Sequence, residues 1–194
     1  MNIPYAVDVR PDTGLYNARL AIWLFLASEA MLFGGFFSAY ALIRSGSTVW
    51  PHHDMNVPLA AFNTAVLIAS SMTMVLAWAS LKSANFRAHR RYLVATVVLA
   101  LLFLGVKSSE YAEHLGRGEG PAHDIFFALY FTMTGLHVLH IVGGVIVMVY
   151  FLGPGASLWQ RDAEQFTNRI ESTGLYWHFV DMVWIFLFPL LYLL

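Results

Sequence analysis

The run STGLYWHFVDMVWIFLFPLLYLL, residues 172–194, decides the fold class of this chain. It is apolar nearly all round, as a helix surrounded by lipid is. It also carries His178 and Asp181, whose three-residue spacing puts them on the same side of a helix. Ionisable groups inside a membrane span are costly and mark functional or structural sites. This pair could relay protons, or could form a neutral network that fixes the position of the helix.

The composition of the whole chain agrees with a membrane protein. Of the 194 residues, 58% are hydrophobic and only 12% are charged, which is too little charge for the surface of a soluble domain. There is no cysteine, so disulfides, thiolate metal sites and cysteine catalysis are excluded. The net charge of −1 argues against a nucleic-acid partner.

Five stretches are long and apolar enough to cross a bilayer. We therefore predict an all-α, polytopic membrane bundle of five transmembrane helices over residues 18–194, preceded by a polar tail over residues 1–17 that lies in the cytoplasm. The connections leave no room for a soluble domain. The predicted spans are Ala18–Ile43, Val57–Leu81, Tyr92–Glu113, Asp124–Leu152 and Ser172–Leu194.

The distribution of lysine and arginine predicts the orientation in the membrane. One side carries eight of the eleven: Arg10, Arg19, Lys82, Arg87, Arg90, Arg91, Arg161 and Arg169. The other side carries Arg44 and Arg117, and Lys107 lies within a span. We expect the N-terminus in the cytoplasm and the C-terminus outside.

Glu29 lies about ten residues into the first span, roughly 15 Å deep at 1.5 Å per residue. A carboxyl at that depth is protonated, paired, or in contact with water or lipid headgroups. Glu29 could be a functional site that binds a proton or a lipid. Alternatively, it could be a structural residue whose hydrogen bond holds two packed helices together.

His137 and His140 reach a similar depth in the fourth span, and the spacing predicts that they share a helix face with Gly144. Metal or haem ligation is the less favoured interpretation, because two histidines at this spacing do not clamp both sides of a haem and no His-Glu-x-x-His motif is present. We instead predict a hydrogen bond from one imidazole to Glu29 across the bundle.

Lys107, Glu110, Glu113 and His114 follow one another at the end of the third span. We expect Lys107 to extend toward the headgroups and the acidic residues to lead out to water, as an interfacial ion cluster of small net energy. Small residues predict close helix packing at Ala30, Gly34 and Gly35 and at Gly135, Gly143 and Gly144. Tryptophans near span ends, including Trp177, predict an aromatic belt.

The sequence lacks the motifs of several enzyme classes. There is no Gly-x-Ser-x-Gly elbow and no phosphate-cradling glycine loop. The spans also lack the paired broken helices of secondary transporters. The residues alone therefore describe a membrane bundle without an enzymatic centre of its own.

Four motifs follow one another along the chain, at residues 23–37, 109–111, 131–144 and 176–188. Together they resemble the cytochrome c oxidase subunit III family. WLFLASEAMLFGGFF (23–37) resembles the helix that carries the family's buried glutamate, here Glu29, and Ser109-Glu110-Tyr111 resembles the family's Glu-Tyr. FTMTGLHVLHIVGG (131–144) resembles its Thr-Gly-x-His-x-x-His motif, and YWHFVDMVWIFLF (176–188) resembles its closing helix. The chain departs from the long form, which has seven spans, and has Lys107 where many members have glutamine.

The resemblance implies a subunit of a proton-pumping haem–copper terminal oxidase in a bacterial cytoplasmic membrane, which reduces oxygen to water with electrons from cytochrome c or a quinol. It implies no cofactor on this chain, haem and copper in partner subunits I and II, a small subunit IV, a supercomplex partner that oxidises cytochrome c or quinol, and phospholipid in a groove between helices. The subunit would support stability and proton uptake of the catalytic subunit. Glu29, Arg169 and Trp177 are the expected lipid contacts, and Glu29, His137, His140, His178 and Asp181 the expected buried polar or proton-related residues.

Two alternatives remain at this point. A nitric oxide reductase accessory subunit belongs to the same superfamily and shares much of the pattern. A free-standing ion transporter built around Glu29 and Lys107 is the remote alternative.

Overall fold

The computed structural model describes residues 17–48, 50 and 55–193. Five long helices in this part of the chain meet the length and hydropathy required to cross a membrane. The helices are α1 (Asn17–Gly46), α2 (Val57–Lys82), α3 (Phe86–Gly116), α4 (Ile125–Leu152) and α6 (Ala163–Phe188). A 3₁₀ turn (Pro154–Ser157) and the short α5 (Leu158–Arg161) precede α6, and a π-helical turn (Pro189–Leu193) follows it.

The predicted spans are confirmed, but two helices begin earlier than the apolar runs that predicted them. Helix α3 begins at Phe86 rather than Tyr92, and α6 at Ala163 rather than Ser172. Both begin where an Asn or Asp side chain accepts a hydrogen bond from a backbone N–H of the first turn: Asn85 from Ala88 at 3.0 Å and Asp162 from Gln165 at 2.8 Å. Polar first turns therefore extend these helices beyond the apolar segment that hydropathy detects.

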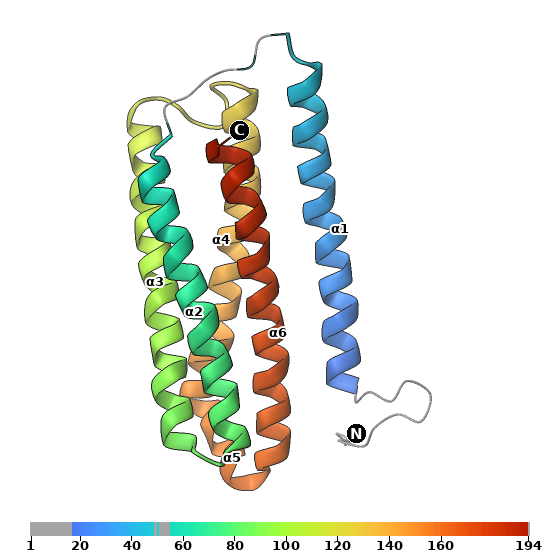
Figure 1. The fold of residues 1–194 in the computed structure, drawn as a ribbon, viewed down its shortest axis with the longest axis vertical. Coiled ribbons are helices and arrows are strands. Elements are labelled where there is room, and N and C mark those ends of the chain that lie inside the picture. The colour runs from blue at the N-terminus through green and yellow to red at the C-terminus, as the bar shows by residue number, and fades with distance from the viewer. Residues whose placement is uncertain (1–16, 49, 51–54, 194) are drawn as a thin grey trace.

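Helices α2, α3, α4 and α6 form a compact four-helix group, whereas α1 stands apart and leans on α6 (Figure 1). Leu26, Phe33 and Tyr40 are the buried hydrophobic residues of α1, and they recur every seven residues along one narrow stripe. Only 11% of the most apolar window of α1 is buried, against 28–44% in the other four helices. Most of the α1 surface is thus left for lipid or for another protein.

Glycine packing occurs at one of the two predicted places. A Cβ on Gly144 would lie 2.8 Å from the ring of Trp177, so α4 and α6 approach closely only because that position has no side chain. The prediction for Gly34, Gly35 and Gly135 is wrong among the described residues, since a Cβ on any of them would meet no atom within 4 Å. Their helix faces point away from this chain's own core.

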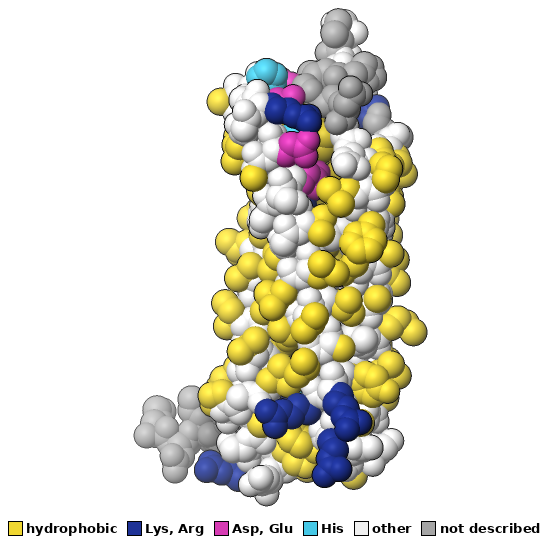
Figure 2. Space-filling view, turned by 90° about the vertical axis from the view of Figure 1, so that its left-hand side faces the viewer, with side chains coloured by type: hydrophobic (Ala, Val, Ile, Leu, Met, Phe, Trp, Pro, Cys, Tyr) yellow, Lys and Arg dark blue, Asp and Glu magenta, His cyan; other side chains and the backbone are white. Residues whose placement is uncertain are grey.

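Charged side chains separate toward the two ends of the bundle (Figure 2). We call the end with Lys82, Arg87, Arg90 and Arg91 the basic end. Glu113, Glu119 and the buried His114 lie near the other end, which we call the acidic end. A broad band of apolar side chains separates the two, as a bilayer requires.

Candidate functional site

Helix α1 makes a polar contact with the rest of the bundle near mid-span, through the hydrogen bond between Glu29 and His140. Nε2 of His140 lies 3.0 Å from Oε2 of Glu29, so the predicted bond across the bundle is present. Nδ1 of His140 lies 2.8 Å from the carbonyl oxygen of Leu136, which can only accept, so Nδ1 must donate. A neutral imidazole then accepts a hydrogen bond at Nε2 from a protonated Glu29, whereas a charged imidazolium donates a hydrogen bond from Nε2 to a Glu29 carboxylate. Either arrangement leaves the pair without net charge.

Aromatic rings enclose this pair. Phe33 of α1 meets the His140 ring edge to face, with ring centroids 5.4 Å apart, and the Tyr176 ring stacks against the same imidazole at 6.4 Å. The Tyr176 hydroxyl donates to the carbonyl oxygen of His140 at 2.8 Å, which ties α6 to α4 beside the α1 contact. The side chains of Glu29 and His140 keep 15% and 11% exposure, so the pair is shielded but still reachable from the outside of the bundle.

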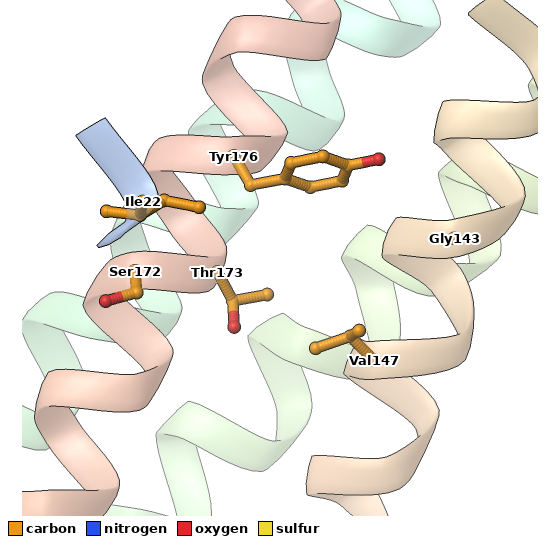
Figure 3. Close-up of a pocket in the computed structure, with 6 residues that line it drawn as sticks. All are labelled: Ile22, Gly143, Val147, Ser172, Thr173 and Tyr176. Carbon is orange, nitrogen blue, oxygen red and sulfur yellow. The ribbon is translucent and has the colours of Figure 1, made fainter. Parts of the chain in front are cut away.

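A pocket of about 350 Å³ adjoins this contact (Figure 3). Its walls come from three helices, and Tyr176 of α6 points across it toward Gly143 of α4. The lining is almost wholly apolar, as suits a hydrocarbon chain. The lining residues are Ile22, Gly143, Val147, Ser172, Thr173 and Tyr176.

Two arginines, Arg19 and Arg169, lie on the basic-end side of this pocket. Arg19 of α1 pairs with Glu171 of α6 at 3.1 Å and forms a second link between these helices. Arg169 lies one turn before Thr173, which lines the pocket. Trp177, expected as a lipid contact, is instead fully buried: its ring packs on Gly144 and its Nε1 donates to Ser70 at 3.0 Å. That expectation, and its place in an aromatic belt, are wrong because the ring faces the bundle centre.

His137 does not take part in the contact between His140 and Glu29. Its ring is fully buried and stacks on Trp184 at 5.1 Å, with Phe103 at its edge at 5.8 Å. Neither ring nitrogen has a hydrogen-bond partner among the described residues. The two histidines therefore share a side of α4, as their spacing predicted, but have different partners: His140 bonds to Glu29 of α1, and His137 packs in the bundle interior. Within the described ranges no group of three His, Cys, Asp or Glu is placed to hold a metal ion.

The expected interfacial cluster around Lys107 is also corrected. Lys107 is only 1% exposed and Glu110 only 5%, so the lysine points into the bundle and does not extend to the headgroups. Its Nζ donates to Oε2 of Glu110 at 3.2 Å and to the hydroxyls of Tyr130 at 2.9 Å and Tyr192 at 2.5 Å. Both tyrosines in turn donate to Oε1 of Glu110. This buried network, Lys107–Glu110–Tyr130–Tyr192, joins α3, α4 and the C-terminal π-helical turn.

The other two members of that expected cluster, Glu113 and His114, differ in exposure. Glu113 is exposed and pairs with Arg117 one turn later, as an interfacial residue should. His114 is buried, and its Nδ1 lies 2.7 Å from a carboxylate oxygen of Glu119. The face that carries Lys107, Glu110 and His114 points inward, and Glu113 alone of the four points to water.

His178 and Asp181 lie on the α2 side of α6 but do not bond to each other. Nδ1 of His178 lies 2.5 Å from the hydroxyl oxygen of Ser71 on α2. Asp181 is 4% exposed. Among the described residues, no donor meets hydrogen-bond distance and angle criteria for either of its carboxylate oxygens. Ser71 still interacts with this carboxyl, so it stands between the two.

Sequence reasoning missed the partners that α2, α4 and the C-terminus contribute: Ser71, Tyr130 and Tyr192. Tyr192 and Lys107 are 85 positions apart, and no local pattern connects them. The available signal was that a buried lysine and carboxylate need further donors and acceptors, which tyrosine hydroxyls near span ends can supply.

Comparison with known proteins places these features in a family. The sequence pattern described as "Cytochrome c oxidase subunit III" matches residues 12–194. The chain is 33% identical to cytochrome c oxidase subunit 3 of Thermostichus vulcanus, over 90% of this chain and 86% of that protein. It is 30% identical to cytochrome bo(3) ubiquinol oxidase subunit 3 of Pseudomonas aeruginosa, over 92% and 85%. It is also 35% identical to the heme-copper oxidase subunit I+III of Aeropyrum pernix, over 90% of this chain but 22% of that longer protein.

Proposed function

Because this chain belongs to the cytochrome c oxidase subunit III family, we propose that it serves as subunit III of a haem–copper terminal oxidase that reduces oxygen to water. The observation that carries the proposal is the match over residues 12–194, together with relatives from both cytochrome c and quinol oxidases. The chain would supply no redox centre and would support the stability and proton uptake of the catalytic subunit.

Subunits I and II, which hold haem and copper, are the proposed partners, with a small subunit IV and a supercomplex partner as further candidates. The relative from Aeropyrum pernix, named subunit I+III, supports subunit I as the neighbour of this chain. The exposed apolar surface of α1 supports a contact with another membrane protein or with lipid.

Purification through a tag on this chain in mild detergent tests the proposal. We expect subunits I and II to co-purify, with a haem spectrum and oxygen consumption driven by cytochrome c or quinol, and the effective donor then identifies the oxidase type. Recovery with a nitric oxide reductase catalytic subunit would support the accessory alternative and overturn oxygen reduction. Haem-free material that carries protons in liposomes would overturn both in favour of a transporter.

We further propose that the pocket between α1, α4 and α6 holds a phospholipid acyl chain, with the headgroup near Arg19 and Arg169. The apolar lining supports the acyl chain, and cationic side chains near the basic end support the phosphate. Glu29 and His140, beside the pocket, would hold α1 in place over the lipid.

Replacing Gly143 by Leu is expected to reduce the lipid that stays bound to the subunit during native mass spectrometry. The added side chain enters the pocket, where a Cβ at this position would lie 3.6 Å from the Tyr176 hydroxyl, in ordinary contact. Gly135→Leu on the same helix is the matched control, because a Cβ there meets no atom within 4 Å. Equal lipid retention by the two variants would contradict this lipid site.

We propose that the basic end faces the cytoplasm, which places the N-terminus inside and the C-terminus outside. The chain has no cysteine, so single cysteines report their side of the membrane without background. Ser83→Cys at the basic end and Ala122→Cys at the acidic end both replace exposed residues. We expect a membrane-impermeant maleimide to label Ala122→Cys in spheroplasts and Ser83→Cys only in inverted vesicles. The reverse pattern would invert the orientation.

A further inference from the structure

We propose that Asp181 is a proton-holding site inside the four-helix group, loaded from a groove at the basic end of the bundle through His178 and Ser71. This inference rests on the geometry of α2 and α6 alone. It goes beyond the proposed subunit role, because it holds whichever catalytic subunit accompanies the chain.

The entrance is a groove of about 220 Å³ between α2 and α6. Glu171 lies at the end of the groove nearest the basic end of the bundle, and His178 lies seven residues further along the same helix. At 1.5 Å per residue the groove thus extends about 10 Å from the ion pair of Glu171 with Arg19 to the imidazole. Apolar walls from Met74, Val75 and Leu175 leave these two residues as the titratable groups of its lining.

The imidazole of His178 connects the groove to the interior. Nδ1 is bound to Ser71 at 2.5 Å, so Nε2 is the nitrogen left for a water molecule in the groove. A histidine in this arrangement can accept a proton at one nitrogen and release another from the opposite nitrogen. Ser71 then presents a hydroxyl, which can accept and donate in the same step.

The interior end is the Asp181 carboxyl. It is 4% exposed, and neither oxygen has a hydrogen-bond partner that meets full geometry among the described residues. Ser71 on α2 is the side chain that interacts with it, and no charged group of the described helices does so. An ionised carboxylate left in such surroundings is costly, whereas the neutral acid is not. The carboxyl therefore has a physical reason to keep a proton, and Ser71 provides the contact through which it exchanges.

The transfer balances without a further reactant. Water in the groove gives a proton to Nε2 of His178, Nδ1 passes its proton to the Ser71 oxygen, and the Ser71 hydroxyl proton moves to the Asp181 carboxylate. One proton has entered, hydroxide is left to the aqueous phase, and His178 ends neutral with its proton on the other nitrogen. Release follows the same steps in reverse.

Infrared difference spectroscopy of the intact complex tests this inference. We expect Asp181→Asn to remove one carbonyl-stretch band of a protonated carboxylic acid, and Asp181→Glu to shift that band. In D₂O the band should shift as the proton exchanges. Ser71→Ala or His178→Phe should keep the band but slow its exchange by about a hundredfold, because the relay is cut.

Ser70→Ala is the matched control. Ser70 precedes Ser71 on α2, but its hydroxyl accepts from Trp177 and lies outside the relay. We expect its exchange rate to equal that of the parent. Three results would overturn the inference: no band lost in Asp181→Asn, unchanged exchange in both relay variants, or equally slow exchange in Ser70→Ala. The last would indicate a general change of the helix contact.

Discussion

Replacing Glu110 by Gln is expected to destabilise the bundle by about 3–5 kcal/mol, because it leaves the buried Lys107 ammonium without its countercharge. Lys107 is 1% exposed, so its ammonium group lies inside the bundle. The rings of Tyr130 and Trp184 lie 4.7 and 5.2 Å from its Nζ, and such ring contacts are worth much less than a lost carboxylate. For a chain of this length the loss corresponds to a fall in the unfolding midpoint on the order of 10 °C.

Thermal unfolding followed by near-ultraviolet circular dichroism in one detergent measures this effect. Glu113→Gln is the matched control: Glu113 lies on the same helix three residues later, is exposed, and pairs with Arg117 at the surface. Its cost should stay within about 0.5 kcal/mol.

The double variant Lys107→Met with Glu110→Leu should recover most of the loss, because it removes both charges together. A Glu110→Gln midpoint equal to that of Glu113→Gln would mean that Lys107 is not buried with Glu110, and would contradict the network.

Trp177→Ala is the second large effect, with an expected cost of about 3–5 kcal/mol. The indole fills the space above Gly144 and donates to Ser70, so its removal leaves a cavity between α2, α4 and α6 and an unpaired hydroxyl. Phe186→Ala is the control on the same helix, since that ring is 57% exposed and faces outward. Unfolding midpoints in detergent compare the two variants. Equal shifts would contradict the central position assigned to Trp177.

The helices themselves could be predicted because their cause is local. About 20 apolar residues in succession make a span wherever they occur, so composition and spacing were sufficient for five helices. The Glu29–His140 bond followed from depth alone: two polar groups at mid-membrane have few possible partners, and these two lie at the same level.

The direction in which a side chain points could not be predicted, because helix rotation depends on neighbours far along the chain. Lys107 was expected at the headgroups, but the tyrosines that hold it inside come from α4 and from the C-terminal turn. Spans that are apolar nearly all round carry no pattern that separates the inward from the outward face. Trp177 was misplaced for the same reason, since a tryptophan near a span end suits a belt and a core equally well.

At His178 and Asp181, one feature could be predicted from the sequence and another could not. Their three-residue spacing correctly predicted a shared side of α6, which is a local property. Ser71, which stands between them, lies on α2 more than 100 positions earlier, and no pattern near either residue predicted it.

The central claim is that this chain supports a haem–copper oxidase without holding its redox groups. Haem content and oxygen consumption of the purified complex, with and without this chain, test it most directly. We predict the same haem per catalytic subunit in both preparations and an oxygen consumption that declines faster during turnover when the chain is absent. A loss of haem in proportion to the missing chain, or unchanged oxygen consumption throughout prolonged turnover, would contradict the account.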